Sequence, residues 1–158
     1  MPDESKRRPI IAVCGAGTCG PDLARTAEEV GREIAGAGAT LICGGLSGVM
    51  EASAKGARQV GGLTIGVLPG PSKHDANPYI DIPVVTNMGQ ARNVIIVSTA
   101  DAVIAVGGAY GTLSEVAIAL KIGKPVVSIG SWEVADEIFR ATNATEAVKI
   151  VMSKLPED

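Results

Sequence analysis

Residues 10–20 read IIAVCGAGTCG, in which a short apolar run leads into the glycine pattern G-x-G-x-x-G. The apolar residues 10–13 are typical of a buried parallel strand. In residues 22–37, which follow, apolar side chains recur every three or four positions, as on one face of an amphipathic helix. A strand, a glycine turn and a helix in this order predict the first unit of an α/β fold.

The same alternation continues along the chain. Apolar runs predict further strands at 40–42, 63–68, 83–86, 102–106 and 126–129, and helical spacing predicts helices at 48–60, 89–99, 112–122, 134–140 and 145–153. The proline-rich residues 69–81 are expected to form a loop. These elements predict one α/β domain over residues 1–158, a Rossmann-like doubly wound parallel sheet with helices on both faces, and a flexible tail at 1–8.

One of these segments is ambiguous, because NVIIVSTA at 93–100 has the β-branched content of a strand. Only Asp101 separates it from the next predicted strand, and two parallel strands need a crossover of about a dozen residues. A helix over 89–99 is therefore favoured, and its unusually apolar face is expected to contact another copy of the chain.

The composition is that of an ordinary globular protein, with 46% apolar residues, 20% charged residues and a net charge of −3. Nucleic-acid binding needs a basic face, and the only basic run is KRR at 6–8, so this function is not expected. No apolar run suits a membrane span or a signal peptide. Three cysteines without paired spacing do not suggest a disulfide framework. We therefore expect a cytoplasmic protein without membrane contact.

The first glycine turn suggests NAD or FAD, but such folds carry Asp or Glu about 20 residues later to hold the ribose hydroxyls. The corresponding stretch here is TLICGG at 40–45, which contains no acid.

Three glycine turns each join a predicted strand to a helix: CGAGTCG at 14–20, GGLSG at 44–48 and GGAYGT at 107–112. In a parallel sheet they meet at one edge, where helix N-termini bind phosphate. They predict a phosphate-bearing ligand; the alternative is that the glycines only make tight turns.

Two of these turns also carry a resemblance. GGAYGTLSE at 107–115 resembles the PGGxGTxxE signature of the LOG-type Rossmann proteins, often mislabelled as lysine decarboxylases, and GGLSGVM at 44–50 resembles their GGxxGxM motif. Alignment without gaps brings Arg92 onto the family's conserved arginine. In the enzymes of this family the arginine and the last glutamate of the signature cleave the base from nucleoside 5′-monophosphates. The resemblance therefore implies catalytic roles for Arg92 and Glu115 if this chain is an enzyme.

The chain departs from the enzymes at several positions. Gly107 replaces the proline of the signature, Ala109 replaces its second glycine, Asn93 stands where the enzymes have lysine, and Glu51 where they have glycine. The stretches LPGPSKHDANPYIDIPVVTNMGQARN at 68–93 and GTLSE at 111–115 more closely resemble the branch that includes the molybdenum cofactor carrier proteins. The resemblance thus implies binding, as a carrier, of a phosphorylated nucleotide or pterin such as the molybdenum cofactor. A phosphoribohydrolase is the alternative, and an interaction module without ligand is the third reading.

The expected site combines the glycine turns with the aligned residues. The ligand-binding residues are expected to be Gly15, Gly17, Gly44, Gly45, Gly48, Met88, Arg92, Asn93, Gly107, Gly108, Ala109, Tyr110, Gly111, Thr112 and Glu115. Replacing Gly108 with valine is expected to weaken ligand binding more than folding. The expected partners are a phosphorylated small molecule and further copies of the chain, in a homodimer or homotetramer.

Several of these residues have a second interpretation. Thr112 and Glu115 form T-x-x-E, the capping box of a helix start, and Arg92 could be a surface charge. No metal site is expected, because His74 is the only histidine and lies in the proline-rich loop. The three cysteines are expected to be small buried fillers rather than reactive thiols.

Overall fold

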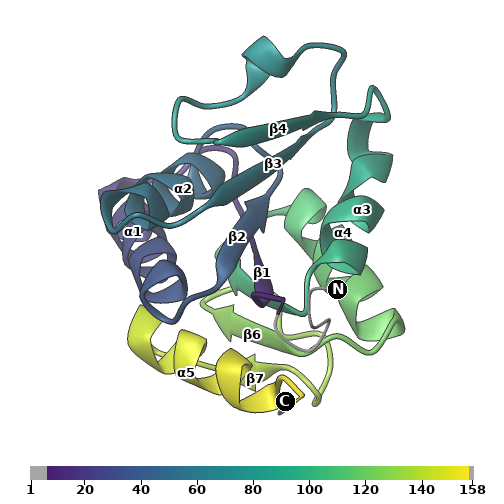
Figure 1. Cartoon of the computed structure of the whole chain (residues 1–158). Helices are drawn as coiled ribbons and strands as arrows, with labels where there is room; N and C mark the ends of the chain where they lie inside the picture. Colours follow the sequence, from purple (N-terminus) through teal and green to yellow (C-terminus); the bar gives the residue numbers. More distant parts are fainter. Residues whose placement is uncertain (1–6, 157–158) are drawn as a thin grey trace.

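The computed structural model describes residues 7–156 and places a seven-stranded sheet at the centre of the molecule (Figure 1). The strands are β1 (Ile10–Gly15), β2 (Thr40–Cys43), β3 (Thr64–Leu68), β4 (Ile82–Val85), β5 (Ala102–Val106), β6 (Val126–Ile129) and β7 (Phe139–Arg140). Their order is β4-β3-β2-β1-β5-β6-β7, and every pair of neighbours is parallel. The predicted parallel sheet is therefore confirmed.

Helices cover both faces of this sheet, as predicted (Figure 1). The α-helices are α1 (Pro21–Gly36), α2 (Val49–Gln59), α3 (Asn93–Thr99), α4 (Tyr110–Lys121) and α5 (Ala144–Lys154). Two 3-10 turns, η2 (Lys73–Asp75) and η3 (Gly89–Arg92), interrupt the connections around β4. α1, α2 and α5 pack on one face of the sheet, and α3 and α4 pack on the other.

The aliphatic core consists of two layers, one on each face of the sheet. In β1, Ile11 and Val13 belong to the layer beneath α1, α2 and α5, whereas Ala12 and Cys14 belong to the layer beneath α3 and α4. All four side chains are buried, because a strand in the middle of a parallel sheet is covered on both faces. This explains why residues 10–13 are uniformly apolar instead of alternating with polar residues.

The chain reverses its winding direction next to β1. It runs outward from β1 through β2 and β3 to β4, and then returns to place β5 on the other side of β1. The helix after β1 and the helix after β5 consequently cover opposite faces. A crevice opens outside the carboxyl ends of two strands whose connections diverge in this way, and ligands of open α/β sheets bind there.

The helix predicted at 134–140 is wrong. Only Phe139–Arg140 is regular there, and it forms strand β7, which pairs with β6 through Val127 and Phe139. The apolar residues 134 and 138 fit helical spacing, but the free edge of β6 offers backbone hydrogen-bonding groups that a strand can satisfy. Long-range pairing, which local spacing does not reveal, decides this segment.

The apolar face predicted at 89–99 packs mainly within the chain. The segment is helical as predicted, with η3 followed by α3, and Ile96 and Val97 are completely buried in the core. Val94 is the exposed apolar residue that remains on α3, at 48% exposure. The predicted flexible tail falls largely on residues 1–6, outside the described residues. No helix within residues 7–156 is long and apolar enough to span a bilayer.

Candidate functional site

A cavity of about 220 Å³ lies at the carboxyl ends of β1, β2 and β5, beside the point where the winding reverses. Eight residues of the predicted site line it: Gly15, Gly17, Gly44, Arg92, Ala109, Gly111, Thr112 and Glu115. The sequence did not single out its other lining residues, which are Val13, Ala16, Leu46, Met50 and Gln90. The three glycine turns thus meet around one cavity, which we call the anion cavity.

The N-terminus of α4 contributes backbone N–H groups to this cavity. The first hydrogen bond of the helix runs from the Leu113 amide to the Ala109 carbonyl, at 3.0 Å. The amides of Tyr110, Gly111 and Thr112 therefore have no acceptor among the described residues, as expected for the first turn of a helix. These donors and the positive end of the helix dipole favour an anion at this position.

The structure rejects the capping-box interpretation of Thr112 and Glu115. α4 begins at Tyr110 with Ala109 as its N-cap, and no side chain caps it. Thr112 is consequently inside the first turn and buried, and Glu115 lies one turn further along, 8% exposed, on the wall of the anion cavity. Gly108, at φ +109°, makes the turn that allows the helix to start this early.

Arg92 is buried at the end of η3, and its guanidinium is held from one side. Its Nε donates to the Val67 carbonyl at 2.9 Å, and its Nη1 donates to the side-chain oxygens of Asn93 and Gln90. Nη2 has no acceptor among the described residues. It lies against Gly44, where an added Cβ would be only 2.8 Å from it, so a side chain at this position would have to displace the guanidinium. The free edge of a fixed guanidinium thus borders the cavity.

Asn93 positions Arg92 without lining the cavity. Its amide oxygen accepts from Nη1 of Arg92, and its Nδ2 donates to the Ser114 hydroxyl at 2.9 Å. Ser114 in turn donates to the Gly111 carbonyl at 2.7 Å, within the first turn of α4. This chain of hydrogen bonds connects the arginine to the helix terminus that faces it. A lysine at position 93 could not accept from the guanidinium.

Glu115 is a buried carboxyl without a hydrogen-bond partner among the described residues. Burial raises the pKa of Glu115 to about 8, and the nearby Arg92 charge lowers it only in part. Burial likewise lowers the pKa of Arg92, which Glu115 opposes. The carboxyl is therefore mostly neutral at pH 7 while the guanidinium stays charged. Because these are the two ionisable side chains on the cavity wall, the cavity carries a net positive charge.

The remaining residues of the predicted site lie around the cavity rather than on it. Gly45, Gly48, Gly107 and Gly108 shape the turns, and Tyr110 and Met88 are exposed outside the cavity at 81% and 49%. A Cβ on Gly108 would collide with the Thr112 side chain. Valine at position 108 is therefore expected to disturb folding as well as ligand binding, so this variant does not separate the two effects. That position needs glycine for the backbone itself.

The proline-rich loop supports the second glycine turn. The Asn77 amide donates to the Gly45 carbonyl at 2.9 Å, and the Asn77 side chain donates to the Leu46 carbonyl at 2.8 Å. His74 is exposed on η2. Within residues 7–156, no group of three His, Cys, Asp or Glu side chains is arranged to hold a metal ion.

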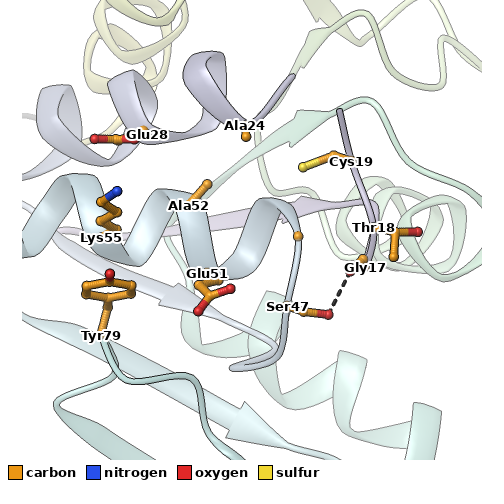
Figure 2. A pocket seen from close by; sticks show the side chains of 11 residues that line it. Gly17, Thr18, Cys19, Ala24, Glu28, Ser47, Glu51, Ala52, Lys55 and Tyr79 are labelled. Atoms are coloured by element: carbon orange, nitrogen blue, oxygen red, sulfur yellow. Dashed lines mark hydrogen bonds between the residues drawn. The ribbon is translucent and has the colours of Figure 1, made fainter. Parts of the chain in front are cut away.

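A larger cavity of about 550 Å³ lies on the other side of the first glycine turn (Figure 2). Gly17 lines both cavities, while Glu51 and Lys55 of α2 and Tyr79 of the loop face the larger one. Gly17 and Gly48 of the predicted site lie on its wall, but the sequence did not indicate a second cavity, because the other lining residues come mainly from α1, α2 and the loop and share no motif. It is the more open of the two, and its ionisable side chains have mixed charge.

Two of the three cysteines are inert fillers, as expected. Cys14 and Cys43 are buried, and burial raises the pKa of both thiols, that of Cys43 to about 12. Neither thiol ionises at neutral pH, so neither is a nucleophile. Cys19 is partly exposed and lines the larger cavity.

Comparison with known proteins gives consistent results. A model of the SLOG cluster4 family matches residues 8–158. The molybdenum cofactor binding protein of Rippkaea orientalis superimposes with a TM-score of 0.89 at 37% identity, covering 94% of this chain and 98% of the other. The molybdenum cofactor carrier protein of Chlamydomonas reinhardtii gives a TM-score of 0.86 at 40% identity, covering 93% and 98%. A cytokinin riboside 5′-monophosphate phosphoribohydrolase of Mycobacterium tuberculosis is 35% identical, over 78% of this chain and 71% of the relative.

Proposed function

Since the chain belongs to the SLOG cluster4 family, we propose that it binds a phosphorylated pterin or nucleotide in the anion cavity and carries it without turnover. This proposal rests on one observation, which is that two sets of hydrogen-bond donors lie together at one small cavity. Within residues 7–156, Nη2 of Arg92 and the first amides of α4 have no acceptor, and both groups border this cavity. A phosphate placed between them would receive charge-assisted hydrogen bonds from both sides.

The protonation state of Glu115 favours ligand binding over cleavage of the ligand. Cleavage of a base from ribose passes through a cation that a carboxylate stabilises. Glu115 is the carboxyl on the cavity wall, and with a pKa of about 8 it is mostly neutral at pH 7. A neutral carboxyl does not repel a phosphate and can donate a hydrogen bond to it. The molybdenum cofactor is the ligand that the two similar solved proteins suggest.

A phosphoribohydrolase remains the second candidate function. It is supported by the placement of Arg92 and Glu115 on one cavity and by the similarity to the mycobacterial phosphoribohydrolase. Incubation with AMP, GMP, CMP and UMP, followed by chromatography, separates the two functions. Release of free base would contradict the carrier. A phosphorylated compound recovered intact from the denatured protein, without base release, would support it.

The Gly111→Ala variant tests the anion cavity without disturbing the fold. An added Cβ at Gly111 meets only the Gln90 side-chain oxygen, at an ordinary 3.8 Å, and alanine is favoured over glycine in a helix. We expect an unchanged or slightly higher melting temperature. The methyl group stands on the cavity wall, so we expect affinity for GMP to fall about tenfold or more, measured by calorimetry.

Gly36→Ala provides the matched control, because Gly36 ends α1 and an added Cβ meets nothing within 4 Å. Its GMP affinity should equal that of the native chain. If Gly111→Ala also left GMP affinity unchanged, the start of α4 would not be the anion site. If the native chain bound neither GMP nor a pterin phosphate, the glycine turns would serve the fold alone, as in an interaction module.

We further propose that the protein assembles as a homodimer or homotetramer. The support is a set of exposed apolar residues on the edge strand β4, in the turn after it and at the start of α3, namely Ile82, Val84, Val85, Met88 and Val94. An exposed edge strand with apolar side chains favours contact with another chain. Light scattering should give a multiple of 16.0 kDa, and Val85→Lys should lower it. A native mass of one chain would contradict this proposal.

A further inference from the structure

Two of the four aromatic side chains of the protein lie together at the start of α4. Tyr110 and Trp132 are stacked, with ring centroids 6.3 Å apart and planes inclined by 22°. Tyr110 is 81% exposed, although aromatic side chains are usually buried for the stability they give the core. The protein has one Trp, two Tyr and one Phe, so this pair contains half of its aromatic side chains.

Hydrogen bonds hold the pair against the third glycine turn. The Trp132 indole N–H donates to the Ala109 carbonyl at 2.8 Å, and the Ser131 hydroxyl donates to the Gly107 carbonyl. The Ser131 amide donates to the Ser128 hydroxyl at 2.9 Å, which ties the loop to β6. Trp132 is therefore fixed behind Tyr110, and the other face of the tyrosine ring is left open.

Tyr110 belongs to the turn that forms one wall of the anion cavity. Ala109 and Gly111, the two neighbours of Tyr110, both line the cavity, and the Tyr110 amide is one of the free donors at its edge. The buried Glu115 carboxyl, which has no partner among the described residues, points independently to a ligand in the same cavity. We infer that Tyr110, backed by Trp132, stacks on the flat heteroaromatic ring of the ligand whose phosphate binds at the start of α4.

The ligand class that fits this arrangement is a purine or pterin monophosphate. In both compounds a short saturated unit separates the phosphate from a flat ring, so the phosphate can occupy the cavity while the ring lies outside it. Flat rings stack on aromatic side chains with little preference among bases. Tyr110 would therefore supply affinity for the ring, and the cavity would supply affinity for the phosphate. This inference rests on the proposed function.

The experiment compares GMP, whose six-membered ring matches that of pterin, with ribose 5-phosphate, which lacks a ring system. Titration calorimetry on the full chain gives both dissociation constants, and fluorescence of the single tryptophan, Trp132, reports ring contact. We expect GMP to bind about tenfold more tightly than ribose 5-phosphate and to change the Trp132 emission. Tyr110→Ala should abolish this advantage, and Tyr110→Phe should restore it. Tyr79→Ala, in the larger cavity, is the matched control and should bind GMP normally.

The possible outcomes separate the inference from the function on which it rests. If Tyr110→Ala bound GMP as the native chain does, the stacking role would be wrong while the anion cavity would stand. If Tyr110→Ala lowered the mass of the assembly and left GMP binding unchanged, the pair would cover another copy of the chain. If neither GMP nor ribose 5-phosphate bound the native chain, the inference and the proposed function would both fail.

Discussion

The Glu115→Gln variant is expected to be more stable than the native chain at pH 8. Burial raises the pKa of Glu115 from 4.5 to about 8, so between these values the folded chain holds a proton that the unfolded chain has released. Stability falls with rising pH wherever the folded state binds more protons. The native chain should therefore lose stability from pH 4.5 to 8 and change little, through this residue, outside that window. Glutamine is neutral throughout and removes the dependence.

The expected size of this effect is about 3–5 kcal/mol at pH 8, because each pKa unit corresponds to about 1.4 kcal/mol. Urea unfolding at pH 5 and at pH 8 measures it. Glu28→Gln is the control, because a hydrogen bond from Gln59 lowers the pKa of Glu28. Its carboxylate stabilises the fold above the unfolded pKa and loses that effect on acidification, which is the opposite sign. Equal pH slopes in native and Glu115→Gln proteins would show that Glu115 ionises normally.

The same ionisation should appear in ligand binding. Above pH 8 the Glu115 carboxylate is charged and repels a phosphate in the cavity that it lines. GMP affinity of the native chain is therefore expected to decrease as the pH rises through about 8. The Glu115→Gln variant should retain its affinity over this range, as long as the arginine stays charged.

Replacement of Arg92 is expected to have the largest effect on binding. Arg92→Met removes the charge at the cavity, and we expect GMP affinity to fall about 100-fold or more, as for a buried charge contact. It also leaves the Val67 carbonyl without its donor, at a cost of about 1–3 kcal/mol in stability. Arg92→Lys keeps the positive charge but loses the planar guanidinium with its paired N–H donors, so its affinity for GMP should fall about tenfold.

Arg58→Met is the matched control for this change. Arg58 forms an exposed ion pair with Asp81 at 2.8 Å, and exposed pairs contribute about 1 kcal/mol or less. GMP affinity should not change in this variant. If the Arg92→Met variant bound GMP with native affinity, the phosphate would not bind in the anion cavity. If the native chain released base from nucleotides and Arg92→Met did not, Arg92 would be catalytic and the carrier function wrong.

Much of the fold could be predicted from the sequence because its signals are local. Residues 10–13 and 102–106 are short apolar runs followed by glycines, and each forms a strand that leads into a helix at the sheet edge. The parallel arrangement brings these turns together, whatever the details of the helices. For this reason the sequence also located the glycine turns around the anion cavity, whereas Arg92, which lies 15 residues before the third turn, was identified only through the family resemblance.

The parts that could not be predicted depend on contacts between distant segments. The T-x-x-E pattern at Thr112 looks like a helix start, but the turn at Gly107 and Gly108, both at positive φ, lets α4 begin at Tyr110. Strand β7 forms because β6 has a free edge, and Trp132 reaches Tyr110 through the loop between these two strands. None of these contacts leaves a periodic pattern in the sequence.

Six of the thirteen residues that line the anion cavity are glycine or alanine, which expose mostly main chain: Gly15, Ala16, Gly17, Gly44, Ala109 and Gly111. A substitution changes side chains and leaves backbone amides in place. An attempt to redesign the protein for a different cargo would therefore act through Leu46, Met50 and Gln90, whose side chains face the cavity. Every variant of these three positions that folds would inherit the same backbone donors. If the proposed function holds, the part of the phosphate affinity that comes from backbone amides is difficult to lose by mutation, whereas the part that comes from Arg92 and the preference among phosphorylated compounds can both be changed.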